Sequence, residues 1–217
     1  MRITASFAAA ALATLLPVLA GTAAAAEGTL EKIARTGEFV IGYRTDSLPL
    51  SFQDRQGRPA GYSVDLCRRI GERVRQHFAD EDIEVKFVPV SSEERIAAVV
   101  DGTIDIECGS TTVTLSRHER VDFSLPTFVT GASIVSLKGS GIEDAADLTG
   151  KRIAVAKGTT TEQKLRAYLA ETAIDAEIVI VGDRTEGWAR LNQDNVDAMA
   201  SDQIVLIGLI MSSQDPT

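Results

Sequence analysis

Short runs of apolar residues alternate along the chain with longer segments in which apolar residues recur every three or four positions. In the first half, after a short helix that ends at Gly37, apolar runs at 39–43, 83–90 and 103–107 predict strands. Helices are predicted at 62–78 and 91–102, and a polar loop rich in proline and glycine fills 44–61. Strands that alternate with helices favour a parallel sheet with helices on its faces.

The second half repeats this pattern after an extended segment at 127–137. Strands are predicted at 151–156, 176–181 and 196–200, and helices at 161–171, 185–193 and 203–211. A constant offset of 92 residues lays one half on the other, pairing Val88 with Ile180, Val99 with Leu191, Ile104 with Val196 and Asp105 with Asp197. We therefore predict two α/β lobes with parallel sheets, one at 27–130 and one at 131–217, joined by the extended segment.

The first 26 residues have the pattern of a secretory signal peptide, with a basic start at Arg2, an apolar run and small residues before Glu27. A membrane anchor is the alternative, but the alanine-rich core and Pro17 disfavour it. We expect cleavage near residue 26 and a mature protein in the bacterial periplasm. Cleavage would change the formal net charge from −9 to −10, because Arg2 is the one charged residue removed. An acidic surface makes nucleic acid a poor partner.

Polar residues follow the carboxyl ends of the predicted strands, where ligands bind in open parallel α/β sheets. They are Arg44, Ser91, Ser92, Ser110, Thr111, Thr112, Gly158, Thr159, Thr160, Thr161, Asp183, Arg184, Ser201 and Asp202. Hydroxyls, helix N-termini and arginine suit a carboxylate, and Asp202 suits an ammonium group. Arg44, Arg95 and Arg184 together supply more positive charge than one α-carboxylate needs. We therefore expect an amino acid with a second carboxylate, bound in a cleft between the lobes. The simpler alternative is that these hydroxyls cap helices and these arginines are surface charges.

His77 and His118 have no second ligand at metal-binding spacing, so we expect neither a metal nor another cofactor. Cys67 and Cys108 form an even pair in an oxidising compartment. They are interpreted either as a disulfide or as two buried thiols, since a helix start and a strand end can be neighbours in a parallel sheet.

An ordered series of motifs carries a resemblance to a known family. "IGYRTDSLPLSF", "GYSVDLC", "SSEERI", "DGTIDIECGSTT", "SRHERVDFS" and "DLTGKRIAVAKGTTTE" resemble the periplasmic solute-binding proteins of polar amino-acid ABC transporters, especially the glutamate/aspartate-binding branch. The resemblance implies a two-lobed, type II binding-protein fold and a monomer that delivers its ligand to an inner-membrane permease. It places Arg44, Ser92 and Arg95 at the ligand's distal carboxylate. It places Ser110, Thr112 and Arg117 at the α-carboxylate, Thr160 at a helix N-terminus, and Asp202 at the α-ammonium.

Two departures from the family pattern stand out. The glutamate/aspartate branch commonly has histidine where this chain has Arg184, which bears on the choice between aspartate and glutamate. The family also continues with a further strand and helices after the position of Thr217, so the chain is expected to be a shortened form. Alternative functions are a dehydratase-like enzyme, for which Asp183 is the spare acid, a receptor sensor domain, and a binding protein for another polar amino acid such as glutamine.

Overall fold

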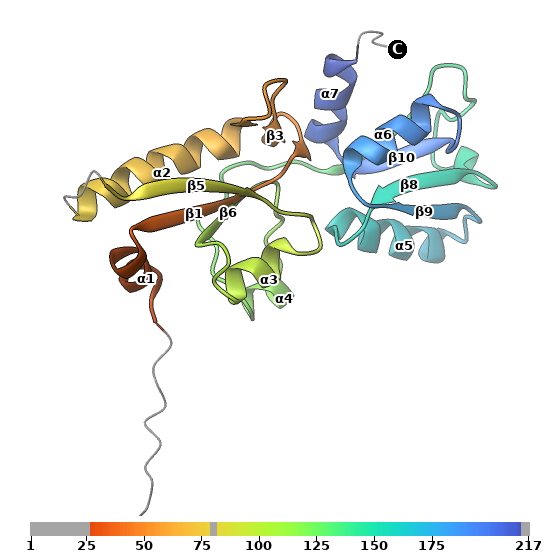
Figure 1. Ribbon diagram of the computed structural model, residues 1–217. Helices are drawn as coiled ribbons and strands as arrows, with labels where there is room; N and C mark the ends of the chain where they lie inside the picture. The colour runs from red at the N-terminus through yellow and green to blue at the C-terminus, as the bar shows by residue number, and fades with distance from the viewer. Residues whose placement is uncertain (1–26, 79–81, 214–217) are drawn as a thin grey trace, which may run out of the picture.

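The computed structural model describes residues 27–78 and 82–213, arranged as two α/β bodies side by side (Figure 1). The predicted signal peptide, 1–26, lies outside the described residues. We call the body that carries the first sheet lobe 1 and the body that carries the later one lobe 2. The lobe limits proposed from the sequence, 27–130 and 131–217, stay predictions. Within the described part of the chain, the helices are too short or too polar to span a membrane.

Lobe 1 is built on a three-stranded parallel sheet in the order β5-β1-β6, with β1 (Glu38–Tyr43) between β5 (Glu84–Pro89) and β6 (Ile106–Cys108). Its helices are α1 (Thr29–Thr36), α2 (Tyr62–Phe78), α3 (Arg95–Val100) and α4 (Leu115–His118). The helix predicted at 62–78 is confirmed at both ends. The core packs α1 and α2 on the sheet through Ile33, Phe39, Ile41, Cys67, Ile83 and Cys108.

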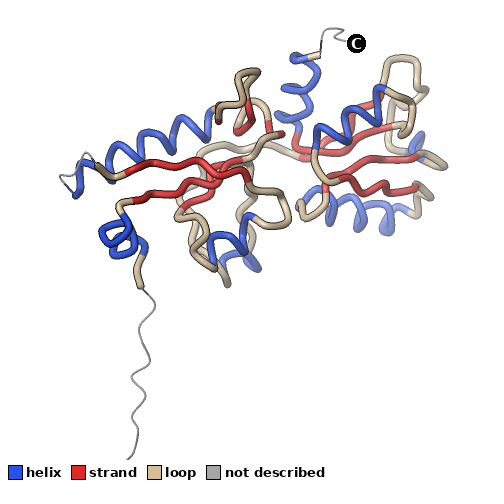
Figure 2. The backbone as a smooth tube through the Cα atoms, viewed as in Figure 1, coloured by secondary structure: helices blue, strands red, loops and turns tan. Residues whose placement is uncertain are grey.

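Three details of lobe 1 differ from the sequence prediction. The helix predicted at 91–102 is shorter and spans Arg95–Val100. The polar loop 44–61 contains a small antiparallel sheet of β2 (Asp46–Ser47), β3 (Ser51–Gln53) and β4 (Pro59–Ala60), whose strands are too short to leave an alternating pattern. The strand predicted at 103–107 begins later, at Ile106, because Asp105 instead uses its backbone N–H and its carboxylate to bond the main chain of Val40. Figure 2 shows these strands as short red segments within tan loop.

Lobe 2 is a four-stranded sheet in the order β7-β10-β8-β9. The strands β8 (Arg152–Ala156), β9 (Glu177–Val181) and β10 (Ala198–Asp202) are parallel, and β7 (Ala132–Ser136), from the predicted extended segment, pairs antiparallel with β10. A 3-10 turn, η1 (Ala146–Leu148), precedes β8. The helices are α5 (Thr160–Thr172), α6 (Arg184–Asn192) and α7 (Gln203–Ser212).

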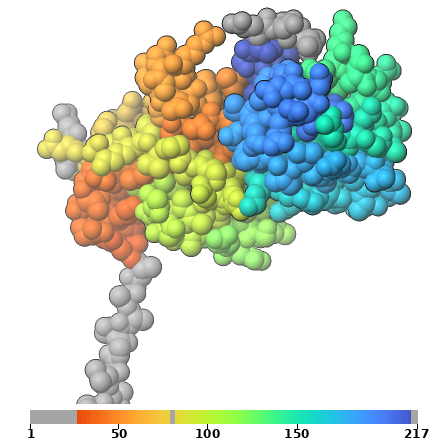
Figure 3. All heavy atoms as spheres, turned by 45° about the vertical axis from the view of Figure 1, so that its right-hand side comes forward, coloured from red at the N-terminus to blue at the C-terminus, as the bar shows by residue number. Residues whose placement is uncertain are grey.

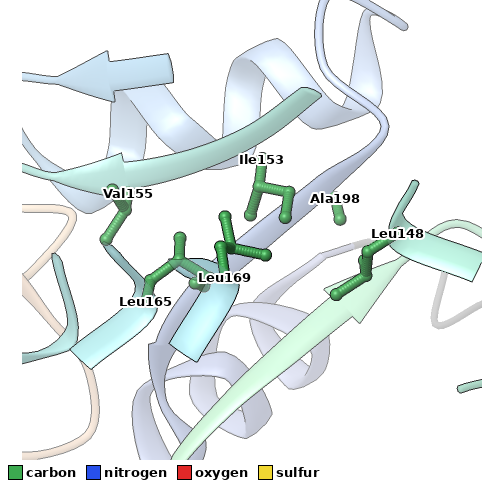
Figure 4. Close-up of a cluster of buried hydrophobic side chains, with 7 residues drawn as sticks. Leu148, Ile153, Val155, Leu165, Leu169 and Ala198 are labelled. Atoms are coloured by element: carbon green, nitrogen blue, oxygen red, sulfur yellow. The ribbon is translucent and has the colours of Figure 1, made fainter. Parts of the chain in front are cut away.

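Helices cover both faces of the second sheet, which explains why β8 is apolar at successive positions. Ile153 and Val155 point from one face toward Leu165 and Leu169 of α5 (Figure 4). On the other face, Ala154 and Ala156 pack with residues of α6 and α7 such as Leu191 and Leu206. This three-layer packing holds the strands from whose carboxyl ends the candidate site residues of lobe 2 project.

Asp105 and Asp197, which the 92-residue offset pairs, have equivalent roles in the two lobes. Asp105 Oδ2 accepts the backbone N–H of Val40 at 2.8 Å, and Asp197 Oδ2 accepts the backbone N–H of Arg152 at 2.8 Å. Each carboxylate therefore ties an inner strand of its sheet, β1 or β8, to the strand that begins directly after the carboxylate, β6 or β10. Asp105 also accepts a bond from Lys32 Nζ at 2.9 Å and its side chain is 3% exposed, whereas that of Asp197 is 32% exposed.

Asp105→Asn is expected to lower the free energy of unfolding by about 1–3 kcal/mol. Lys32 and the N–H of Val40 are both hydrogen-bond donors, and the amide N–H₂ of asparagine, itself a donor, would have to face one of them. The matched variant Asp197→Asn should lose less, because water reaches its carboxylate. Urea unfolding of the two variants and the parent chain measures both differences. An equal or larger loss in Asp197→Asn would contradict this ranking.

Cys67 and Cys108 form a disulfide, which decides between the two interpretations left open by the sequence. Their Cα atoms are 6.4 Å apart, and the bridge joins α2 to the carboxyl end of β6 across 41 positions of sequence. Cys108 is followed directly by Gly109 and Ser110. The bridge therefore anchors the base of the loop that carries the hydroxyl residues predicted to bind a carboxylate.

Candidate ligand site between the lobes

The two lobes contact each other at the carboxyl ends of their strands. Lys157 Nζ lies 2.9 Å from Glu93 Oε1, and the hydroxyls of Thr112 and Thr160 are 3.0 Å apart. Gly158 has a left-handed φ of +72°, and a Cβ there would lie 2.9 Å from Glu93 Cα, so glycine permits this close approach. Figure 3 shows lobe 2, in cyan and blue, directly against the yellow and orange atoms of lobe 1.

A buried carboxylate, Asp46, lies at the centre of this contact. Its Oδ1 accepts from Arg44 Nε at 3.1 Å and Arg44 Nη2 at 2.7 Å, and its Oδ2 accepts the backbone N–H of Arg184 at 2.8 Å. Burial acts to raise the pKa of Asp46, but the charges of Arg184 and Arg44 outweigh it and hold the pKa below its usual value. Asp46 is therefore ionised at neutral pH.

Arg184 begins α6 in lobe 2 and is 2% exposed, so the surface-charge alternative does not hold for it. Its guanidinium lies among side chains of both lobes. It donates to Ser201 Oγ at 2.9 Å, Ser47 Oγ at 3.0 Å, Asp202 Oδ2 at 3.3 Å and Ser110 Oγ at 3.5 Å. The 92-residue offset also pairs Ser110 with Asp202, and Arg184 hydrogen-bonds to both of them.

Arg95 differs from the other buried arginines because its charge is largely unmatched. Its side chain is 2% exposed, and within 27–78 and 82–213 neither Nε nor Nη1 has a hydrogen-bond partner. The nearest carboxylate oxygen, Glu107 Oε1, is 4.0 Å from Nη1. Burial lowers the pKa of Arg95 to about 10; Glu107 opposes this effect and the other three guanidiniums add to it. The group remains charged at neutral pH, so it is a buried cation whose nearest carboxylate, Glu107, does not hydrogen-bond to Nε or Nη1.

The loop after β6 carries the remaining predicted residues. Arg117 Nη1 donates to the carbonyl of Thr112 at 2.8 Å, and its Nη2 donates to the carbonyl of Gly158 in lobe 2 at 3.4 Å. Burial lowers the pKa of Arg117, against the opposing charge of Glu107. Gly109 allows the loop to pass close to Arg44, because a Cβ would lie 2.7 Å from Arg44 Cγ and would collide with Glu107 Oε1.

The sequence-predicted residues gather in one region, which we call the interlobe site. Arg44, Ser92, Arg95, Ser110, Thr112 and Arg117 come from lobe 1, and Thr160, Arg184 and Asp202 come from lobe 2. Ser92 is 3% exposed and its hydroxyl, like Arg95, has no hydrogen-bond partner in the described part of the chain. A cavity of about 480 Å³ lies away from this region, between β7 and α5. Ligand binding by the nine residues stays a prediction.

The structure adds three residues that the sequence did not single out for this site, namely Asp46, Ser47 and Glu107, and it places the strand-end residue Ser201 against Arg184. It also shows that Arg44 is fully engaged, because its Nη1 donates to the carbonyl of Val90 at 2.8 Å while Nε and Nη2 bond Asp46. Asp46 and Ser47 lie in a polar loop that resembles an ordinary turn. An aspartate two residues after a strand-end arginine is the signal in the sequence that could have indicated Asp46.

Comparisons with known proteins show which family the chain belongs to. The model of the bacterial extracellular solute-binding proteins, family 3, matches residues 39–197. A glutamate/aspartate import solute-binding protein of Salmonella typhimurium is 36% identical over 89% of this chain, and an L-glutamate/L-aspartate-binding protein of Pseudomonas aeruginosa is 36% identical over 87%. The chain spans 64% and 63% of the length of these two relatives.

Solved structures show the same fold. ArgBP from T. maritima has a TM-score of 0.75 at 26% identity, covering 86% of this chain and 77% of its own. An ancestral amino acid-binding protein, a precursor of cyclohexadienyl dehydratase, has a TM-score of 0.71 at 29% identity, covering 82% and 75%. The predicted two-lobed, type II periplasmic binding-protein fold is confirmed, and the chain belongs to the bacterial extracellular solute-binding proteins, family 3.

Proposed function

We propose that this protein is the periplasmic binding component of an ABC importer for acidic amino acids, glutamate or aspartate. The names of the relatives support an import role and an acidic ligand. In this proposal the protein acts as a monomer, holds the amino acid in the interlobe site without chemical change, and passes it to a permease in the inner membrane. The predicted signal peptide at 1–26 would direct it to the periplasm.

The observation that carries the proposal is the unmatched charge of Arg95. The interlobe site contains four guanidiniums, those of Arg44, Arg95, Arg117 and Arg184. It contains three carboxylates, those of Asp46, Glu107 and Asp202. One positive charge therefore remains, and glutamate and aspartate each carry one net negative charge at neutral pH. A ligand of that charge neutralises the site, whereas glutamine leaves the positive charge buried.

The donors within the site suit the separate groups of such a ligand. Arg117, with the hydroxyls of Ser110, Thr112 and Thr160 at the start of α5, suits the α-carboxylate. Arg95 and the Ser92 hydroxyl, both with unused hydrogen-bonding groups, suit the distal carboxylate. Asp202 suits the ammonium group.

Because these groups come from different lobes, one ligand would contact both. Binding would then favour the arrangement in which the lobes meet, and release would require them to separate. In this way the site can capture and deliver a ligand by hinge motion alone.

A panel of amino acids tests the proposal. Glutamate or aspartate is expected to raise the melting temperature, since a ligand at 100 times its Kd adds about 2.7 kcal/mol of stability. Glutamine and arginine should produce a much smaller shift at the same concentration, and titration calorimetry would give the affinities. Equal or tighter binding of glutamine or arginine would overturn the acidic-ligand proposal.

A further inference from the structure

We propose that Asp46 determines the ligand charge that the interlobe site accepts, by acting as a buried counter-ion shared between the two lobes. This inference rests on the proposed function and deepens it. Asp46 would make the site favour an acidic amino acid over a dicarboxylate of the same length that lacks the amine. Asp46 is thus a specificity-determining residue that need not touch the ligand.

The bonds of Asp46 divide between the lobes. Oδ1 accepts hydrogen bonds from Nε and Nη2 of Arg44, and from the Ser47 hydroxyl at 3.1 Å, all within lobe 1. Oδ2 accepts the backbone N–H of Arg184, at the start of α6 in lobe 2, and lies 3.7 Å from Arg184 Nη1. The side chain is 1% exposed, so water screens these charges very little. One carboxylate therefore compensates a guanidinium from each lobe.

This compensation leaves Arg44 with little capacity for a ligand. All three of its donor nitrogens are bonded, two to Asp46 and one to the carbonyl of Val90. The positive charge that remains free for a ligand is consequently concentrated at Arg95. Arg117, which follows the loop after β6, lies nearby. Asp46 determines how much charge is free as well as where it lies.

The charge count gives the effect on ligand preference. With Asp46 ionised the site has one net positive charge, which suits glutamate. Without that carboxylate it has two, which suits glutarate, the same carbon chain with two carboxylates and no amine. Loss of the charge should therefore strengthen glutarate binding relative to glutamate binding.

Asp46→Asn keeps the shape of the side chain and removes its charge. Titration calorimetry of glutamate and glutarate, against this variant and the parent chain, gives four Kd values. The ratio of the glutarate Kd to the glutamate Kd is expected to fall about tenfold, the effect of one unit charge across roughly 10 Å at an effective dielectric constant near 20. A ratio that changes by less than about twofold would overturn the inference.

Asp54→Asn is the matched control, because Asp54 belongs to the same loop region and its carboxylate pairs with the exposed Arg58 outside the site. It should leave the ratio unchanged. A tenfold fall in this control would show a general effect of protein charge and would overturn the inference. If the parent chain binds neither acidic ligand, the proposed function fails. If it binds glutamate and Asp46→Asn leaves the ratio unchanged, only the role of Asp46 fails.

Asp46→Asn also leaves two buried guanidiniums without their counter-ion, so it can fail to fold. The double variant Asp46→Asn/Arg184→Met removes one charge of each sign and restores the original net charge. Its absolute affinities should fall, because Arg184 lies in the site, but the ratio should return to within about threefold of the parent value. A tenfold shift in the double variant would show that ligand preference does not follow the net charge of the site, and would overturn the inference.

Discussion

Arg95→Met is expected to weaken glutamate binding by about 3–5 kcal/mol, or roughly 200- to 5,000-fold in Kd, because a buried distal carboxylate would lose its cation. The same variant should make the protein more stable in the absence of ligand. Arg95 is 2% exposed and its Nε and Nη1 lack partners among the described residues, so methionine of similar length removes a desolvated charge. We expect a gain of about 1–3 kcal/mol in the free energy of unfolding.

Urea unfolding without ligand and calorimetry with glutamate measure the two effects separately. Arg73→Met is the matched control, because Arg73 is exposed on α2 and its Nη1 bonds only the nearby Gln76 among the contacts described. Both quantities should stay close to the parent values in that control. An Arg95→Met protein that is less stable than the parent, or that still binds glutamate tightly, would show that Arg95 supports the fold and not the ligand.

Replacement of both Cys67 and Cys108 by alanine is expected to lower the free energy of unfolding by about 4 kcal/mol, because the bridge restricts a loop of 41 positions in the unfolded chain. The denaturant dependence should become steeper, since an unfolded chain without the bridge exposes more surface.

Equilibrium unfolding of the double variant against the oxidised parent tests this. Treatment of the parent with a reductant under denaturing conditions, followed by refolding in the reductant, is a second route to the same bridge-free state. The two bridge-free proteins should agree closely in stability. A loss below about 1 kcal/mol in both would mean that the loop is already restricted in the unfolded state.

The sequence predicted the succession of strands and helices, and the edge of each sheet at which the candidate residues gather, because both follow from local patterns. The apolar runs at β1, β5, β8, β9 and β10 are long enough to identify, and the carboxyl ends of parallel strands meet at one edge of each sheet. Arg44, Ser110 and Asp202 could be chosen on that ground alone. Arg95 and Arg117 could not, because they lie on helices beyond the strand ends and entered mainly through the family resemblance.

What the sequence could not give is the pairing of charges inside the site. Asp46 bonds the main chain of Arg184 across 138 positions, and no periodicity relates such distant residues. Glu107 looked like the last polar residue of a strand, yet its carboxylate accepts from Thr111 at 2.7 Å and faces Arg95. Which arginines are compensated and which are free depends on how the lobes meet, and local patterns carry no information about that.

The order of strands along the chain also has a consequence for folding during synthesis. Every strand of the β5-β1-β6 sheet precedes β7, so the first sheet can be completed while the second half is still on the ribosome. The bonds that hold each sheet together span 65 positions at Asp105 and 45 at Asp197, whereas Asp46 and Arg184 are 138 apart. The contacts between the lobes therefore span longer stretches of chain than the bonds within each sheet, and the sheet of lobe 1 can form before Arg184 has been synthesised.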